Sequence, residues 1–221
     1  MTSSIVHKVW MAVTGLFLVV FLAVHMAGNL QLFLPESSAR PAFNGYSALL
    51  TSNPFIKVAG WLTYLSVVVH TVLAARVSVR NRRARRRGYA IRATSSPWYT
   101  RSMGWLGTVV LLFLVWHLQM FWYRYHWGPI GLDAEGNKDL YAVVVASFAQ
   151  PGIVALYVVC MVALGFHLQH GVAAAVRSVG VFGAGASRWA ERGAVWIAWG
   201  LVIPFALMPV YVYLTAGGPT S

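Results

Sequence analysis

Histidine is the residue type in this sequence whose placement is hardest to explain by packing alone. Four histidines, His25, His70, His117 and His167, each lie inside a different long apolar run, and the fourth run also carries His170. An imidazole in an apolar helix can form an interhelical hydrogen bond, or it can bind a metal through an unprotonated ring nitrogen. One such residue fits either role, but one on each of four successive runs favours metal ligation.

The apolar runs that carry these histidines predict membrane-spanning helices. The 221 residues are 58% hydrophobic and only 10% charged, whereas about a quarter of the residues in a soluble domain are charged. Five runs are long enough to cross a hydrocarbon core of about 30 Å. They lie near Val9–Leu32, Phe55–Val79, Ser102–Tyr123, Pro151–Val176 and Ala194–Thr215. We therefore expect an all-α protein, a polytopic bundle of five transmembrane helices that forms one domain over residues 1–221.

The fourth apolar run is too long for a single crossing, because it extends back to Ala142. Pro151 and Gly152 mark the expected start of the span, since proline favours the first turn of a helix. Residues 141–150 are then expected to form a short lead-in at the membrane surface. None of the runs alternates between polar and apolar residues, which excludes membrane β-strands.

The basic residues are distributed very unequally between the two sides of the predicted bundle. One side carries Lys8, nine arginines from Arg76 to Arg101, and Arg177, Arg188 and Arg192. The other side carries Arg40, Lys57, Arg124 and Lys138, together with four of the five acidic residues. The positive-inside rule therefore predicts a multi-pass protein of the inner (cytoplasmic) membrane with a cytoplasmic N-terminus and an external C-terminus. We expect the arginine-rich loop to contact anionic lipid or an acidic protein partner, and not nucleic acid.

The depths of the histidines sort them into two pairs. At about 1.5 Å per helical residue, His25 and His117 lie ~26 Å and ~24 Å from the nearest basic residue of the arginine-rich side. By the same count His70 lies ~9 Å and His167 ~15 Å from that side. His170 lies ~10 Å from that side, so depth does not distinguish His167 from His170 as the partner of His70.

Two facing histidines at each depth are what a six-coordinate haem b requires, with one neutral imidazole on each side of the iron. Gly28 and Gly171 follow two of these histidines by three and four residues, and their lack of a side chain would leave room for a flat macrocycle. The single cysteine, Cys160, excludes a C-x-x-C-H site for covalent haem attachment. The sequence thus predicts two non-covalent haems b and an electron path across the membrane.

The motifs around these histidines resemble a known family. They read "TGLFLVVFLAVHMAGN", "VVVHTVLAARV", "LVWHLQMFW" and "GFHLQHG", and the first two spans are joined by "AFNGYSALLTSNPF". Together they are similar to the dihaem cytochrome b membrane subunit, of the b558 type, of succinate:quinone oxidoreductases (succinate dehydrogenase and fumarate reductase). The resemblance covers nearly the whole chain.

The resemblance implies specific ligands and partners. It pairs His70 with His167 around the haem nearer the cytoplasm, and His25 with His117 around the distal haem, which is the pairing that the depths give. It implies a flavoprotein subunit with FAD and an iron–sulfur subunit on the cytoplasmic side, with the succinate site on the flavoprotein. This chain would then transfer electrons to or from a membrane quinone, expected to be menaquinone.

Three residues have roles that the resemblance leaves open. His170 is expected near a haem edge or a quinone, or as a plain interfacial histidine. Asn44 and Tyr46 are candidate quinone contacts, although an interfacial structural role fits them equally well.

Some family members carry a glutamate for transmembrane proton movement at the position of Gly165, so we assign no such route here.

Two other functions remain possible at the level of sequence. The chain could be the cytochrome b anchor of another oxidoreductase, of the hydrogenase or formate dehydrogenase type. It could also be a non-haem transporter, which would have discontinuous helices and further polar groups inside the membrane. The only residues that support this alternative are Asn29, Gln31 and Pro204.

Overall fold

The structure is a computed structural model, and it describes residues 4–85, 98–179 and 187–217. Within these ranges five helical segments are long and apolar enough to cross a membrane. They are built on α1 (Ser4–Asn29), α3 (Pro54–Arg85), α5 (Met103–His117), α8 (Pro151–Val179) and α9 (Ser187–Val212). The predicted all-α bundle with five transmembrane helices is therefore confirmed.

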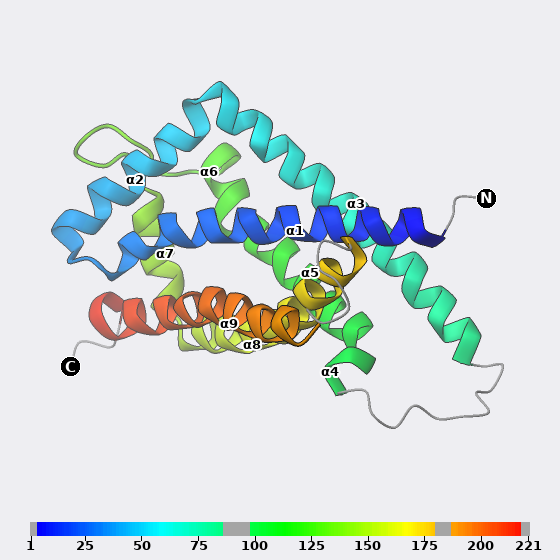
Figure 1. Cartoon of the computed structure of the whole chain (residues 1–221). Coiled ribbons are helices and arrows are strands. Elements are labelled where there is room, and N and C mark those ends of the chain that lie inside the picture. The colour runs from blue at the N-terminus through cyan, green and yellow to red at the C-terminus, as the bar shows by residue number, and fades with distance from the viewer. Residues whose placement is uncertain (1–3, 86–97, 180–186, 218–221) are drawn as a thin grey trace.

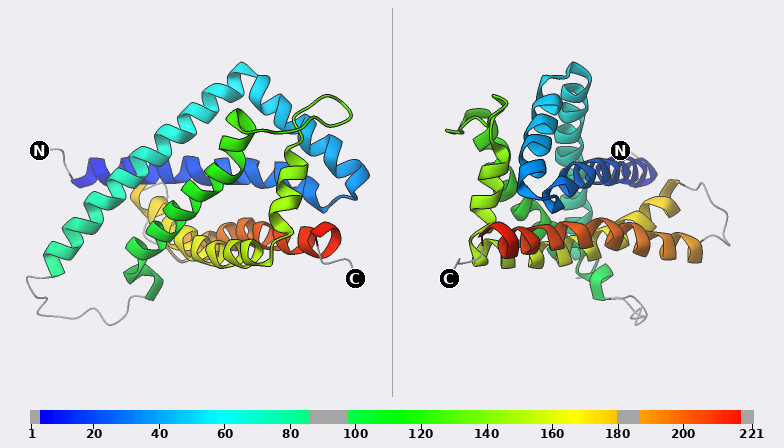
Figure 2. Two further views of the ribbon diagram at one scale, coloured as in Figure 1. Left: turned by 180° about the vertical axis from the view of Figure 1, so that it is seen from behind. Right: turned by 90° about the vertical axis from the view of Figure 1, so that its left-hand side faces the viewer.

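The five long helices cross one another at several angles (Figure 1). Helices α8 and α9 run antiparallel and pack along much of their length, and α1 packs against both of them. Helix α3 packs mainly against α1, and α5 packs against α8. Both α3 and α5 run obliquely to the α8–α9 pair, as the two views in Figure 2 show. Helix α8 is the most buried of the five spans.

Short helices gather at the two ends of the bundle. Helices α2 (Glu36–Ser52), α6 (Arg124–Trp127) and α7 (Leu140–Phe148) lie at the end where α1 finishes, which we call the α2 end. Helix α4 (Trp98–Arg101) lies at the opposite end, which we call the α4 end, and contacts α5 and α8. The expected lead-in before Pro151 is helix α7, and Pro151 is the first residue of α8, where its missing N–H is not needed.

Three predicted spans change helix type near their ends, the first to a 3-10 helix over Leu30–Phe33 and the fifth to a π-helix over Tyr213–Gly217. After His117 the third span changes to a π-helix over Leu118–Tyr123 and then to α6. Helix α9 passes through Pro204 and Pro209 without interruption. Asn29 and Gln31 donate hydrogen bonds to the carbonyl groups of His25 and Gly28, so these two amides satisfy the end of their own helix. The features that suggested a transporter thus have local structural explanations.

The outward surface of the spans is apolar. Large side chains such as Trp61, Trp105 and Trp196 are more than two-thirds exposed. In a helical bundle whose backbone groups are satisfied within each helix, such a surface is suited to contact with lipid. Buried residues that include Phe43, Tyr141, Phe148 and Tyr157 form a core cluster at the α2 end, where the short helices close over the spans.

Candidate functional site

The structure brings the four intramembrane histidines together as two pairs. The ring centres of His25 on α1 and His117 on α5 lie 6.0 Å apart, with their planes at 89°. The ring centres of His70 on α3 and His167 on α8 lie 6.3 Å apart, with their planes at 72°. We call these the α1–α5 pair and the α3–α8 pair. Each histidine comes from a different helix, and each is half-buried.

The separation of the rings fits two ligands of one metal. A metal–imidazole bond of about 2 Å on each side, plus roughly 1 Å from each nitrogen to its ring centre, places the centres roughly 6 Å apart. The steep angles between the planes exclude face-to-face stacking of the rings. The spacing within both pairs therefore fits two imidazoles on opposite sides of an iron.

The two histidines of each pair come from helices that do not pack closely against each other. In the described part of the chain, neither α1 with α5 nor α3 with α8 is among the closely packed helix pairs. The contacts that join the bundle run instead through α1 with α3, α1 with α8 and α5 with α8. A flat ligand between two helices requires such a separation, because side chains would otherwise interlock there.

Two glycines that the sequence analysis did not select lie against the α3–α8 pair. A Cβ atom placed at Gly15 would lie 3.3 Å from Cε1 of His70, and one at Gly107 would lie 3.5 Å from Cε1 of His167. These glycines let the backbones of α1 and α5 approach the two rings. The expectation for Gly28 was wrong, because a Cβ there would collide with the ring of Tyr46. A Cβ at Gly171 would meet nothing within 4 Å, so the space expected beside this glycine is open.

A ten-residue spacing connects the two levels of the site. Gly15 contacts the α3–α8 pair and His25, ten residues later on α1, belongs to the α1–α5 pair. Gly107 and His117 repeat this arrangement on α5. Ten residues of α-helix span about 15 Å, so both helices give the same separation of the two levels.

The same spacing is visible in the sequence. The pattern G-x9-H occurs as "GLFLVVFLAVH", "GWLTYLSVVVH" and "GTVVLLFLVWH", which end at His25, His70 and His117. In the fourth helix Tyr157 stands ten residues before His167. This repeat is the signal that could have identified Gly15 and Gly107 before the structure was known.

Polar side chains lie near the Nδ1 atoms of three of the four histidines, and the longest of these contacts is the 3.5 Å from Nδ2 of Asn29 to Nδ1 of His25. Nδ1 of His117 lies 2.9 Å from the hydroxyl of Tyr157. Nδ1 of His70 lies 3.3 Å from Oγ1 of Thr14, whose own proton is donated to the carbonyl of Trp10 at 2.8 Å. Oγ1 of Thr14 is thus placed to accept a hydrogen bond from Nδ1–H of His70. A ring that donates from Nδ1 keeps Nε2 unprotonated, which is the state of a metal ligand.

The two pairs differ in their surroundings. The rings of Phe21 and Phe205 lie 5.6 Å from His25, and those of Phe113 and Phe121 lie 5.7 and 5.3 Å from His117. In the α3–α8 pair, Nδ1 of His167 is buried and has no hydrogen-bond partner within the described ranges. An unsatisfied buried nitrogen is rare and often marks a functional position. The α1–α5 pair is therefore enclosed by aromatic rings, and the α3–α8 pair rests on glycines.

His170 does not join either pair. Its Nδ1 lies 3.1 Å from Oγ1 of Thr100, so the ring is turned toward α4. The neighbouring Gln169 donates to the hydroxyl of Tyr99 at 3.4 Å and accepts from Nε1 of Trp199 at 3.0 Å. These contacts fasten the end of α8 to α4 and α9.

A side chain of α9 packs against Gly165. This is the position at which some members of the family that the chain resembles carry a glutamate. A Cβ atom at Gly165 would lie 3.0 Å from the ring of Trp199. A carboxyl side chain would displace this tryptophan. The space that a proton-conducting residue would need at this position is therefore filled.

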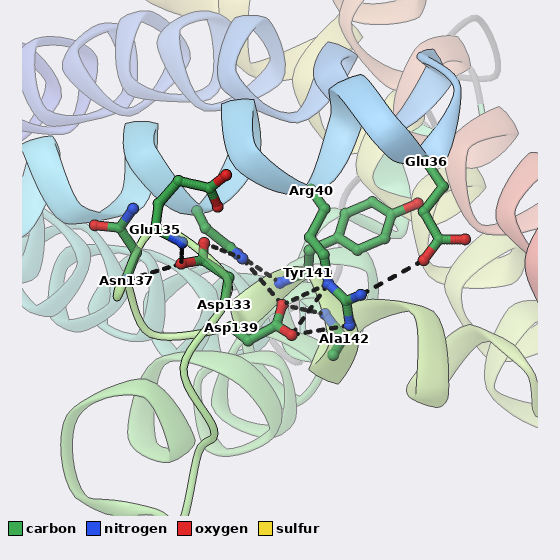
Figure 3. Close-up of polar contacts among 9 residues, drawn as sticks. Glu36, Arg40, Asp133, Glu135, Asn137, Asp139, Tyr141 and Ala142 are labelled. Carbon is green, nitrogen blue, oxygen red and sulfur yellow. Dashed lines mark hydrogen bonds and ion pairs between the residues drawn. The ribbon is translucent and has the colours of Figure 1, made fainter.

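The first of the two proposed quinone contacts, Asn44, lies in a buried polar network at the α2 end. Its amide donates to Asp133 and Asp139 at 3.0 and 2.9 Å, and its carbonyl oxygen accepts from the backbone of Tyr141 at 2.9 Å. Figure 3 shows this network, in which Arg40 lies between Asp139 and Glu36. Both amide protons of Asn44 are thus used in joining α2 to α7. The other proposed quinone contact, Tyr46, packs its ring against Gly28.

The carboxylate of Asp139 is the charged centre of this network. Burial alone would raise its pKa, but hydrogen bonds from Asn44, from the backbone of Ala142 and from Arg40 outweigh burial and lower the pKa below its ordinary value. Arg40 lies 2.9 Å from this carboxylate, and the pKa of its guanidinium is raised by that hydrogen bond and charge. Asp139 also caps the start of α7. Both groups are therefore charged over the whole neutral range.

Comparisons with protein-family models, with curated proteins and with solved structures find no match to this chain. The two histidine pairs and their surroundings are therefore the features of the chain that indicate its function.

Proposed function

We propose that this chain is the membrane cytochrome b subunit of a succinate:quinone oxidoreductase, and that each histidine pair binds one haem b. The observation that carries the proposal is the pairing of four histidines from four helices, with ring centres 6.0 and 6.3 Å apart. The two levels are about 15 Å apart along α1 and α5. Haem b bound at each pair would supply a carrier of single electrons.

The residues of the chain have separate tasks in this proposal. His25 and His117 hold one group near the α2 end, and His70 and His167 hold the other near the α4 end. Thr14 and Tyr157 orient two of the four rings, as hydrogen-bond partners of ligating histidines commonly do. The aromatic rings around the α1–α5 pair exclude water from it.

Assignment to a succinate:quinone oxidoreductase is supported by the ordered motifs and the connecting segment that resemble that family. The arginine-rich segment is consistent with an acidic iron–sulfur partner on the cytoplasmic side, because complementary charge accelerates and orients association. Residues 86–97 of this segment lie outside the described ranges. In this assignment the chain passes electrons between the iron–sulfur subunit and quinone, while FAD and succinate are bound by the flavoprotein.

The haem content tests the first part of the proposal. The full chain, expressed with ample haem supply and purified in detergent, should give a low-spin b-type spectrum and about two haems per chain in a pyridine haemochrome assay. His25→Ala and His70→Ala should each leave about one haem. A haem-free wild-type protein would exclude the proposal and leave a non-haem transporter.

Copurification tests the second part. An affinity tag on this chain should recover a flavoprotein and an iron–sulfur protein that together reduce a quinone analogue with succinate. Neutralising Arg82, Arg83, Arg85, Arg86 and Arg87 should weaken that recovery. Recovery of hydrogenase or formate dehydrogenase subunits with a haem-containing chain would assign it to one of those complexes instead.

A further inference from the structure

A pocket at the α2 end contains basic and polar side chains that the proposed electron path does not use. Its volume is about 480 Å³, and it is lined by Ala48, Thr51, Lys57, Tyr125, His126, Gly136, Asn137 and Lys138. These residues come from the end of α2, the first turn of α3, helix α6 and the loop before α7. Segments far apart in the sequence therefore build one site.

Lys138 is fixed in this pocket by two contacts. Its ammonium group donates to the carbonyl of Tyr125 at 2.6 Å and lies 5.1 Å from the centre of the Tyr125 ring. The hydroxyl of Tyr125 lies 3.3 Å from Oγ1 of Thr51, which ties α6 to α2. An ammonium group has three protons, so Lys138 retains two donors for a ligand.

Lys57 adds a second ammonium group, and His126 adds an imidazole. Lys57 is exposed and forms no ion pair within the described ranges. Nδ1 of His126 lies 2.9 Å from the carbonyl of Trp122, an arrangement in which Nδ1 donates and Nε2 remains for another partner. The pocket thus presents two ammonium groups and an imidazole from three different elements.

The charges of this pocket are not balanced by the residues that line it, since none of them is acidic. Of the acidic residues nearby, Asp133 accepts hydrogen bonds from Asn44 and from backbone N–H groups of its own loop, Asp139 is paired with Arg40, and Glu135 is exposed and does not line the pocket. Two like charges in one pocket repel each other unless an anion lies between them. This imbalance indicates an anionic ligand.

The surroundings of the pocket indicate its depth in the membrane. The Trp122 ring lies 4.7 Å from His126, 4.9 Å from Trp127 and 5.7 Å from Tyr64. Clusters of tryptophan and tyrosine are typical of the boundary between hydrocarbon and water, where lipid headgroups lie. Lysine binds phosphate as a compact charge, and basic pockets at this depth bind lipid headgroups.

We propose that this pocket binds a phosphate group through Lys57 and Lys138, either in a phospholipid headgroup or as inorganic phosphate. The site is independent of haem and of the histidine pairs. Its ligand would join α2, α3, α6 and the loop before α7.

Native mass spectrometry of the full chain, with any subunits that copurify, tests this site. Wild-type protein should retain added phosphatidylglycerol more strongly than phosphatidylcholine, because only the first has net negative charge. Lys57→Gln with Lys138→Gln should weaken retention of phosphatidylglycerol by about tenfold, the effect of losing a charge-assisted hydrogen bond. Arg124→Gln is the matched control, since it removes a cation of α6 that does not line the pocket.

The source of the phosphate is distinguished by competition. Displacement of phosphatidylglycerol by millimolar inorganic phosphate, with sodium chloride as the control for ionic strength, would assign the site to a free anion. Resistance to phosphate would assign it to the lipid headgroup. Lys57→Gln alone breaks no described hydrogen bond, so it should fold normally and still weaken retention. Unchanged retention in the lysine variants, or an equal loss in Arg124→Gln, would overturn the proposal.

Discussion

The hydroxyl of Tyr157 lies 2.9 Å from Nδ1 of His117, so a residue of α8 holds the histidine that ends α5. The contact occurs where α5 changes to a π-helix. A π-turn inside a helix is uncommon and frequently marks a functional position. The ring of Tyr157 is buried against Phe113, Phe148 and other residues of the core cluster, which leaves little freedom for the hydroxyl.

Replacing Tyr157 with phenylalanine tests whether this contact tunes the proposed haem site. The ring would remain packed, but Nδ1 of His117 would lose its partner and the imidazole would become a weaker electron donor. We expect two haems to remain bound and the midpoint potential of the one at the α1–α5 pair to rise by about 60 mV or less, a shift of up to tenfold in a one-electron equilibrium. Redox titration followed by visible absorption measures this change. A downward shift or unchanged potentials would contradict it.

A leucine at Gly15 tests the close approach of α1 to the α3–α8 pair. Its Cβ would lie 3.3 Å from His70, and the rest of the side chain would displace the ring. We expect haem content to fall from about two toward one per chain, because one ligand of that pair would be misplaced. The control is Gly200→Leu on α9, where a Cβ meets nothing within 4 Å. Equal haem content in the two variants would show that Gly15 has no role in the site.

Hydropathy and charge predicted the spans well because lipid imposes a simple rule on helix length and composition. Each predicted span lies within one residue of the bounds of an observed apolar helical segment or inside it, and the fourth begins at Pro151 as expected. Helix α2 was missed as a helix because it is polar and contains Pro41. The π-helix at Leu118–Tyr123 was also missed, since its residues have the same apolar character as those of the α-helix before it.

Within the site, the residue types were easier to predict than their partners. Depth alone placed the histidines at two levels, because rise per residue is nearly constant in a helix. The contacts of Gly15, Gly107, Thr14 and Tyr157 depend on how the helices cross and rotate, which single-helix periodicity does not specify. Asn44 shows the same limit, since its partners Asp133 and Asp139 lie about ninety residues away in sequence.

Asp139→Asn tests the polar network at the α2 end. The pKa of Asp139 is lowered in the folded chain, so its ionised form stabilises the fold above the pKa of an unfolded aspartate, and this stabilisation is lost as pH falls through the lower folded pKa. We expect the variant to lose about 1–3 kcal/mol at neutral pH, since Asp139 is buried and hydrogen-bonded to Arg40 and Asn44. Thermal unfolding in detergent measures the loss. The difference from wild type should shrink below about pH 4.

Glu36→Gln is the matched control for this network. Glu36 lies 3.7 Å from the same arginine, but both side chains are substantially exposed. Its loss should cost about 0.5 kcal/mol or less. A cost at Glu36 equal to that at Asp139 would show that burial of Asp139 does not strengthen its interaction with Arg40.

The two histidines of "FHLQH" provide the sharpest test of the α3–α8 pair. The ring of His167 lies 6.3 Å from that of His70, whereas His170 is turned toward Thr100 of α4. We expect His167→Ala to lose the haem near the α4 end and to retain the other, giving about one haem per chain. His170→Ala should retain both, because the lost contact fastens α8 to α4 without meeting His70. Haem assay together with redox titration separates the two sites by their potentials. If His170→Ala lost one haem and His167→Ala retained two, His170 would be the ligand and the pairing of His167 with His70 would be a packing contact only.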